Sequence, residues 1–179
     1  MALGGAAELT SYRAGELDRA VADLLVGWVL IGCGLALWKR RESDRVGPLL
    51  AASGVAWFVG DFLTPPLYLH RGPLVQALLS FPSGRLPGPV ARIVVVLAYL
   101  DGAIGPVGHS AIMTLVLCGM IAAVAIAGYL SETGVRRQSR RVASGGAVAV
   151  ASVLSFGAAG RIAGWGTDAA TLRAYETAL

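Results

Sequence analysis

Long apolar runs separated by short clusters of charge dominate this sequence, and they limit what the chain can fold into. A transmembrane helix needs about 20 mostly apolar residues, because the hydrocarbon core of a bilayer is about 30 Å thick. Six segments approach that length, and the third is short: 20–38, 46–64, 67–81, 91–107, 110–130 and 142–165. The pattern predicts an all-α fold, an integral membrane bundle of about six transmembrane helices.

The amount of charge agrees with lipid as the main surroundings. Charged residues make up 15% of the chain, hydrophobic residues 55%, and the mean hydropathy is +0.65. Soluble domains contain about 25% charged residues. The isoelectric point near 9.5 does not indicate nucleic-acid binding, because the basic residues lie beside the ends of the apolar runs. We expect the lipid bilayer as a partner and no nucleic acid.

The basic residues also predict an orientation. With the N-terminus outside, the outer face holds only Arg13, Arg19, Arg71, Arg161 and Arg173. The inner loops then hold Lys39, Arg40, Arg41, Arg45, Arg85, Arg92, Arg136, Arg137, Arg140 and Arg141. The positive-inside rule therefore favours an external N-terminus in the cell membrane. Loss of the short third span would reverse one half of this arrangement.

Three regions follow along the chain. Residues 1–19 form a short external tail, 20–165 the six-helix transmembrane domain, and 166–179 an external tail or the lead-in to a missing seventh span. No cleavable signal peptide is expected, because no basic start precedes an apolar core in the first 20 residues.

Small residues recur at every fourth position in three of the segments, which predicts close helix packing. The stripes are Ala52, Ala56 and Gly60; Gly119, Ala123 and Ala127; and Ala143, Ala147, Ala151, Ser155 and Ala159. The alternative is that Ala and Gly are simply common in this chain. Cys33 and Cys118 lie within apolar runs and are interpreted as packing residues.

Polar side chains inside the spans are the candidate functional residues, because an ionisable group in a membrane is costly unless it is paired or hydrated. Asp101 is predicted near the bilayer centre, and Asp61 toward the outer leaflet as a partner for Arg161. With Tyr68 and His70 they would form a polar pocket, open to the outside, for a proton or a small ligand. The alternative is that Asp61 and Arg161 join two helices, His70 and His109 face water, and a neighbouring hydroxyl caps Asp101.

No known catalytic motif is present. The sequence lacks a phosphate-binding Gly-Lys-Ser loop, a His-Glu-x-x-His pair, clustered Cys or His ligands and a nucleophile elbow. Catalysis, a cofactor and a metal are therefore not expected from these residues.

Two stretches form recognisable motifs. The first is Arg45-Val46-Gly47-Pro48-Leu49-Leu50 after a basic loop, followed by Trp57-Phe58. The second is the inner-loop motif Phe81, Pro82, Ser83, Gly84, Arg85 and Leu86. Together they resemble the multi-span N-terminal input region of actinobacterial sensor histidine kinases, and the resemblance runs from about residue 20 to residue 141. It implies signalling through a cytoplasmic kinase that dimerises, phosphorylates its own His with ATP and transfers the phosphate to a response regulator.

The chain departs from that family at its end. It contains no phosphoacceptor helix or ATP-binding domain, so a fragment with an intact input half is expected, with homodimerisation through helix packing implied by the resemblance. Two other functions stay open. One is a stand-alone transporter or channel-like protein that uses Asp101 as its coupling site. The other is a membrane scaffold that partners another subunit through its small-residue stripes.

Overall fold

The computed structural model describes residues 17–40, 45–63 and 68–163, and every regular element in these ranges is a helix. The helices are α2 (Leu17–Arg40), α3 (Val46–Asp61), α4 (Arg71–Ser80), α5 (Pro89–Ala103), α6 (Gly105–Gly108), α7 (Ala111–Ser131) and α8 (Gly134–Ile162). The all-α prediction is confirmed. Each of the six expected segments coincides with a helix, although the bounds differ. The expected tails lie mostly outside the described residues.

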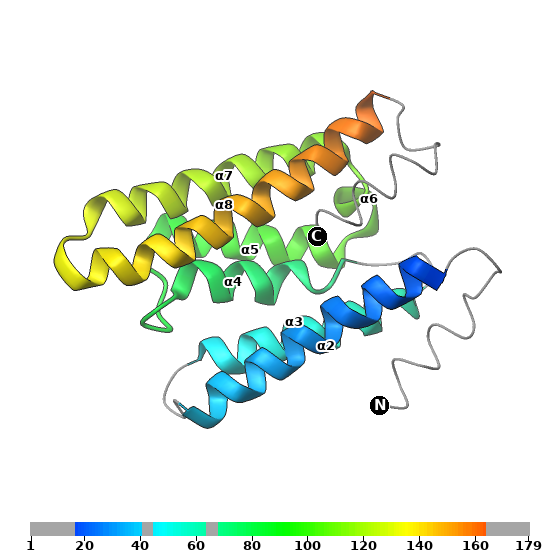
Figure 1. Cartoon of the computed structure of the whole chain (residues 1–179). Coiled ribbons are helices and arrows are strands. Elements are labelled where there is room, and N and C mark those ends of the chain that lie inside the picture. Colours follow the sequence, from blue (N-terminus) through cyan, green and yellow to red (C-terminus); the bar gives the residue numbers. More distant parts are fainter. Residues whose placement is uncertain (1–16, 41–44, 64–67, 164–179) are drawn as a thin grey trace.

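The helices form three antiparallel pairs, α2–α3, α4–α5 and α7–α8, and the middle pair lies between the other two (Figure 1). α3 packs on α4, while α4 and α5 pack on α7, and α4 also packs on α8. The described core of buried apolar side chains lies where α4, α5, α7 and α8 meet. It consists of Val75, Leu79, Val94, Val95, Ala98, Leu117, Ile121, Ala125 and Ala147.

Two described helices are long and apolar enough to cross a membrane: α7 and the part of α8 from Arg140 to Ile162. This is fewer than the six spans expected. Length explains this for three of the other helices, since α3, α4 and α5 have 16, 10 and 15 residues, but it does not apply to α2, which has 24. At 1.5 Å per residue, α4 is only about 15 Å long. The third expected segment is therefore too short to cross a bilayer as a straight helix.

The fourth expected span is broken in two. α5 ends at Ala103, Ile104 is extended, and the single turn of α6 follows. The cause is Pro106, which has no backbone N–H and would clash with the carbonyl four residues earlier if the helix continued. The break moves Asp101 from the expected middle of a span to the last turn of α5.

α8 begins eight residues earlier than expected, at Gly134. The basic run from Arg136 to Arg141 was expected in a loop, and it forms the first turns of this helix instead. The side chains of Arg137, Arg140 and Arg141 therefore lie on the surface of a helix.

The inner-loop motif forms the turn between α4 and α5, as predicted. α4 ends at Ser80, and Phe81 is extended. Ser83 Oγ lies within hydrogen-bonding distance of the Ser80 carbonyl (3.4 Å) and accepts from the Arg85 N–H (3.3 Å). Gly84 has a φ of 66°, which favours glycine.

Glycines bring α2 and α3 into backbone contact. A Cβ added to Gly34 would overlap the backbone of Ala51 and Gly47, whereas one added to Gly32 would meet nothing within 4 Å. The stripe predicted for this segment is buried only in part: Ala52 is exposed, Ala56 is half-buried and Gly60 is buried. The contact with Gly34 uses Gly47 and Ala51 instead.

The small-residue stripe predicted for α8 is confirmed in part, whereas the one predicted for α7 is not. In α8 the stripe is confirmed over Ala143, Ala147 and Ala151, which are buried. In α7 the three predicted residues, Gly119, Ala123 and Ala127, are all exposed. α7 turns larger residues inward: Leu117, Ile121 and Ala125.

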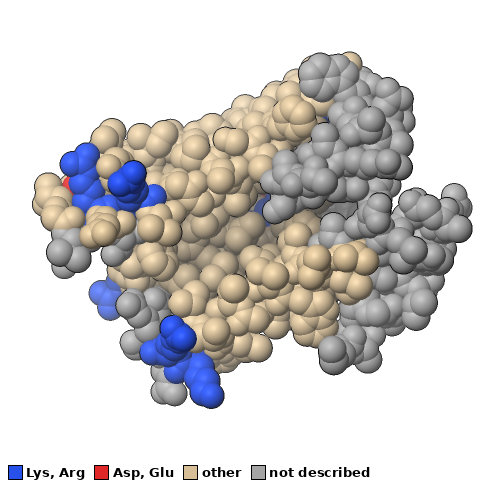
Figure 2. All heavy atoms as spheres, viewed as in Figure 1, with Lys and Arg blue, Asp and Glu red and all other residues tan. Residues whose placement is uncertain are grey.

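Basic side chains gather at one end of the bundle. Figure 2 shows Lys and Arg at the end where α2 meets α3 and α7 meets α8, while the rest of the described surface in that view is largely uncharged. The basic residues described at this end are Lys39, Arg40, Arg45, Arg85, Arg92, Arg137, Arg140 and Arg141. The opposite ends of α4 and α8 hold Arg71 and Arg161.

Candidate functional site

A buried ion pair joins the start of α4 to the end of α5. Arg71 is the first residue of α4, and its Nη1 donates to Asp101 Oδ2 at 2.5 Å. Arg71 is 5% exposed and Asp101 is 3% exposed. The pairing follows from topology, because α4 and α5 are antiparallel neighbours, so the first turn of one lies beside the last turn of the other (Figure 1).

Aromatic and backbone groups complete the surroundings of Arg71. Its guanidinium lies over the ring of Tyr68, with Cζ 4.0 Å from the ring centroid, and Nη1 also donates to the Gly108 carbonyl at 3.4 Å. The Tyr68 ring lies 5.2 Å from the imidazole of His109, centroid to centroid. Cation–π contact and hydrogen bonds offset part of the cost of burying the charge.

Two glycines let the chain close tightly around this pair. A Cβ on Gly108 would overlap the Asp101 carbonyl oxygen and the Tyr68 ring, and a Cβ on Gly102 would overlap the Tyr68 carbonyl. Any larger residue at these positions would separate α5, α6 and the Tyr68 turn. The ion pair is thus enclosed by protein atoms on these sides.

Each partner of the pair keeps one unused polar atom. Arg71 Nε and Asp101 Oδ1 are buried and have no hydrogen-bond partner among the described residues. A buried group without a partner costs free energy. This donor and this acceptor could serve a water molecule or another small polar group.

His70 lies beside the pair, in the turn that precedes α4. Its imidazole contacts the ring of Trp57 on α3 at 4.4 Å and lies 6.4 Å from the Tyr68 ring, both between centroids. Burial and then the neighbouring Arg71 charge lower the pKa of His70 from 6.5 to about 3. His70 is therefore neutral at neutral pH, which argues against its use as a proton sensor near pH 7.

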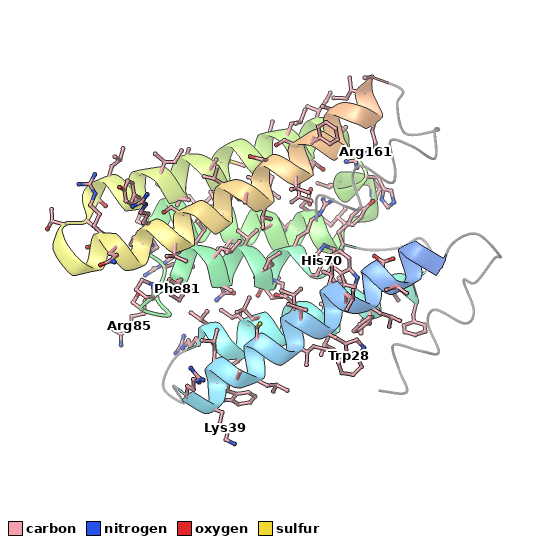
Figure 3. The ribbon with its side chains drawn as sticks, viewed as in Figure 1. Trp28, Lys39, His70, Phe81, Arg85 and Arg161 are labelled. Carbon is pink, nitrogen blue, oxygen red and sulfur yellow. The ribbon has the colours of Figure 1, made fainter. Side chains whose placement is uncertain are left out.

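The residues of the predicted pocket are brought together only in part. Tyr68, His70 and Asp101 lie around the ion pair. Arg161 is exposed in the last turn of α8, and Figure 3 places it at the same end of the bundle as His70. The Asp61 side chain lies outside the described part of the chain, so its pairing with Arg161 stays a prediction.

Sequence reasoning missed Arg71, which was expected at the outer surface. It also expected a hydroxyl beside Asp101, and the structure places a guanidinium there instead. A signal was present in the sequence, because Asp101 needs a cation and Arg71 precedes an apolar segment at the same expected face. Without knowledge of which helices are neighbours, however, the sequence could not assign Arg71 to Asp101.

The described side chains provide no group of three or more His, Cys, Asp or Glu residues that could hold a metal ion. Chemically, the arrangement offers one paired carboxylate, one guanidinium and two nearby imidazoles. Such a set can bind a polar group or keep two helices together.

Comparison with protein-family models, with curated proteins and with solved structures found no match.

Proposed function

We propose that this chain is the membrane-embedded input region of a sensor histidine kinase, and that its helices transmit a signal to a cytoplasmic output. The observation that carries the proposal is the buried Arg71–Asp101 ion pair, which connects two helices at the end opposite the basic residues. In the resemblance, the output is a kinase that phosphorylates a response regulator, and the input region dimerises.

A membrane location is supported by the outward faces of the helices. Ile112, Val116 and Leu130 of α7 are exposed, as are Val55 and Val59 of α3 and Ile93 and Val96 of α5. Soluble monomers rarely expose apolar surface on this scale. We propose that the five longer helices and α4 all lie in the bilayer, with the short α4 shielded by the helices around it.

The proposed orientation places the N-terminus outside and the basic end inside. The residues of the basic end lie at the end of α2, in the α2–α3 and α4–α5 turns, and at the starts of α5 and α8. Cytoplasmic loops carry an excess of Lys and Arg. The Arg71–Asp101 pair then lies toward the outer side, where a stimulus could reach it.

A two-state element is needed for signalling, and the ion pair can supply one. Anything that binds the unused Asp101 Oδ1 or Arg71 Nε better in an open arrangement would shift the population toward separation of α4 from α5. The α4–α5 turn at the inner end contains the inner-loop motif. Separation of α4 from α5 at the outer end would therefore move this motif.

A transporter is the second candidate function, and the buried charge of Asp101 favours it. Against it, glycine-mediated contacts close the surroundings of the pair. The two functions differ in one measurement. In proteoliposomes, Asp101→Asn should abolish solute flux if the chain is a transporter.

The experiment that tests the proposal begins with the gene. The reading frame should continue past the codon for Leu179 into a phosphoacceptor helix and an ATP-binding domain. In that full-length protein, Asp101→Asn should change the rate of autophosphorylation in response to stimulus. The kinase portion expressed without residues 1–179 should show no response to the same stimulus. A stop codon directly after Leu179 would overturn the kinase proposal and favour a transporter or a partner subunit.

A further inference from the structure

Two exposed arginines lie one helical turn apart at the start of α8. Arg137 and Arg141 are four residues apart, so their side chains share one face of the helix, with Cβ atoms about 5–6 Å apart. The guanidinium of Arg137 lies over the ring of Tyr129 on α7, 4.8 Å from its centroid. Arg140, beside them, donates from Nη1 to the Leu79 carbonyl at the end of α4 (3.3 Å). This last bond fixes the first turns of α8 against α4.

The charge of this turn is not neutralised by the described part of the protein. None of Arg137, Arg140 and Arg141 forms an ion pair there, and Arg140 Nε is buried without a partner. Glu132, close by in sequence, forms no ion pair with them either. Like charges one turn apart destabilise a helix. An anion from outside the chain would remove that repulsion.

Exposed apolar residues flank these side chains in the sequence. Val142, which follows Arg141, is 73% exposed, and Leu130, which follows Tyr129, is 64% exposed. A small inorganic anion would leave this apolar surface uncovered. A molecule with an anionic head and an apolar tail covers both surfaces at once.

We propose that α7 and α8 bind an anionic phospholipid at this end of the bundle. The headgroup phosphate lies between Arg137 and Arg141, and an acyl chain lies along Leu130 and Val142. Arginine suits this ligand because its guanidinium donates parallel hydrogen bonds to phosphate oxygens, and Tyr129 is the type of residue found at headgroup depth. The inference rests on the membrane location given under the proposed function.

The test uses the full chain purified in a neutral detergent. Dioleoyl phosphatidylglycerol and dioleoyl phosphatidylcholine are titrated separately, and bound lipid is counted by native mass spectrometry. The wild type should prefer phosphatidylglycerol. R137Q/R141Q should bind it on the order of 30-fold more weakly, roughly fivefold for each arginine, and should bind phosphatidylcholine as before. R137K/R141K keeps the charges and should keep most of the preference.

A matched control removes two arginines from the same end but from another helix pair. R40Q/R45Q changes the α2–α3 turn and should leave the preference for phosphatidylglycerol within about twofold. An equal loss in R40Q/R45Q would show diffuse attraction by the basic end and would overturn the site. If glycerol phosphate competed as well as the lipid, the ligand would be a free phosphate and the proposal would fail.

Folding and membrane location are checked separately. Circular dichroism should show unchanged helix content in all three double variants, and R141Q alone provides the measurement if R137Q/R141Q does not fold. Extraction of cell membranes with alkaline carbonate should leave the wild type in the membrane. Retention without any lipid preference would overturn this inference alone, whereas release would overturn the proposed membrane location as well.

Discussion

Asp101 carries a charge that the described residues neutralise with a single guanidinium, that of Arg71. Both side chains are almost fully buried, so neither can be hydrated when the other is lost. Removing one partner of a buried pair is more costly than replacing both with apolar residues, because a lone buried charge remains. Single and double substitutions of Arg71 and Asp101 therefore distinguish a stabilising ion pair from simple packing of the two side chains.

We expect Asp101→Asn to lower the free energy of unfolding by about 3–5 kcal/mol. R71M/D101L should cost less than either single substitution, because no charge is left buried. The measurement is unfolding of the purified protein by SDS, followed by circular dichroism. A double variant as unstable as the sum of the single variants would contradict coupling between the two residues.

His70 provides a second test at this scale. Its pKa is lowered to about 3 in the folded protein, against 6.5 in the unfolded chain. Below pH 6.5 the unfolded state therefore binds a proton that the folded state does not, and stability falls as the pH is lowered toward 3. Between pH 7 and pH 5 the loss should reach up to about 2 kcal/mol.

The measurement is the SDS unfolding midpoint of wild type and His70→Gln at several pH values. Besides the Trp57 and Tyr68 rings, the groups near His70 are Arg71 with its partner Asp101, and His109 beyond Tyr68. The substitution should flatten the pH dependence over this range. A slope that does not change would assign the dependence to other groups.

At the scale of helices, the α2–α3 contact depends on glycines that allow backbones to touch. Gly34 and Gly32 belong to the same helix and are two residues apart, yet only Gly34 faces the partner helix. Substituting these two glycines in turn therefore separates the effect of helix propensity on stability from the effect of helix packing.

Gly34→Ala should lower the free energy of unfolding by about 1–3 kcal/mol, because the new methyl group would push against the backbone of α3. Gly32→Ala is the matched control and should be neutral or stabilising by up to about 1 kcal/mol, since Ala is the better helix former. Both variants are compared by SDS unfolding. Equal effects would show that the two helices are not in close contact.

For the whole molecule, the separation of basic residues to one end leads to a topology test. In a variant with Cys33 and Cys118 replaced by Ala, a single Cys at position 85 or 161 is treated with a membrane-impermeant maleimide on intact spheroplasts. We expect labelling of Arg161→Cys and none of Arg85→Cys until the membrane is opened, because Arg85 belongs to the basic end. The reverse labelling would invert the proposed orientation.

Much of the local structure could be predicted from the sequence. Apolar runs, the Phe81–Leu86 turn and the basic clusters predicted the positions and order of the main helical segments, because these features act within a few residues of the chain. Boundaries were less accurate. The break at Pro106 and the helical start of α8 shifted them, which changed how many helices are long enough to cross a bilayer.

The sequence by itself determined that the chain is helical and apolar, and where its helices turn. The tertiary structure alone decided that Arg71, rather than a hydroxyl, is the partner of Asp101, and that α7 turns Ile121 inward and Gly119 outward. The physical reason is range. Helix formation and turns depend on neighbouring residues, whereas a charge partner and a packing face depend on which helices become neighbours in space.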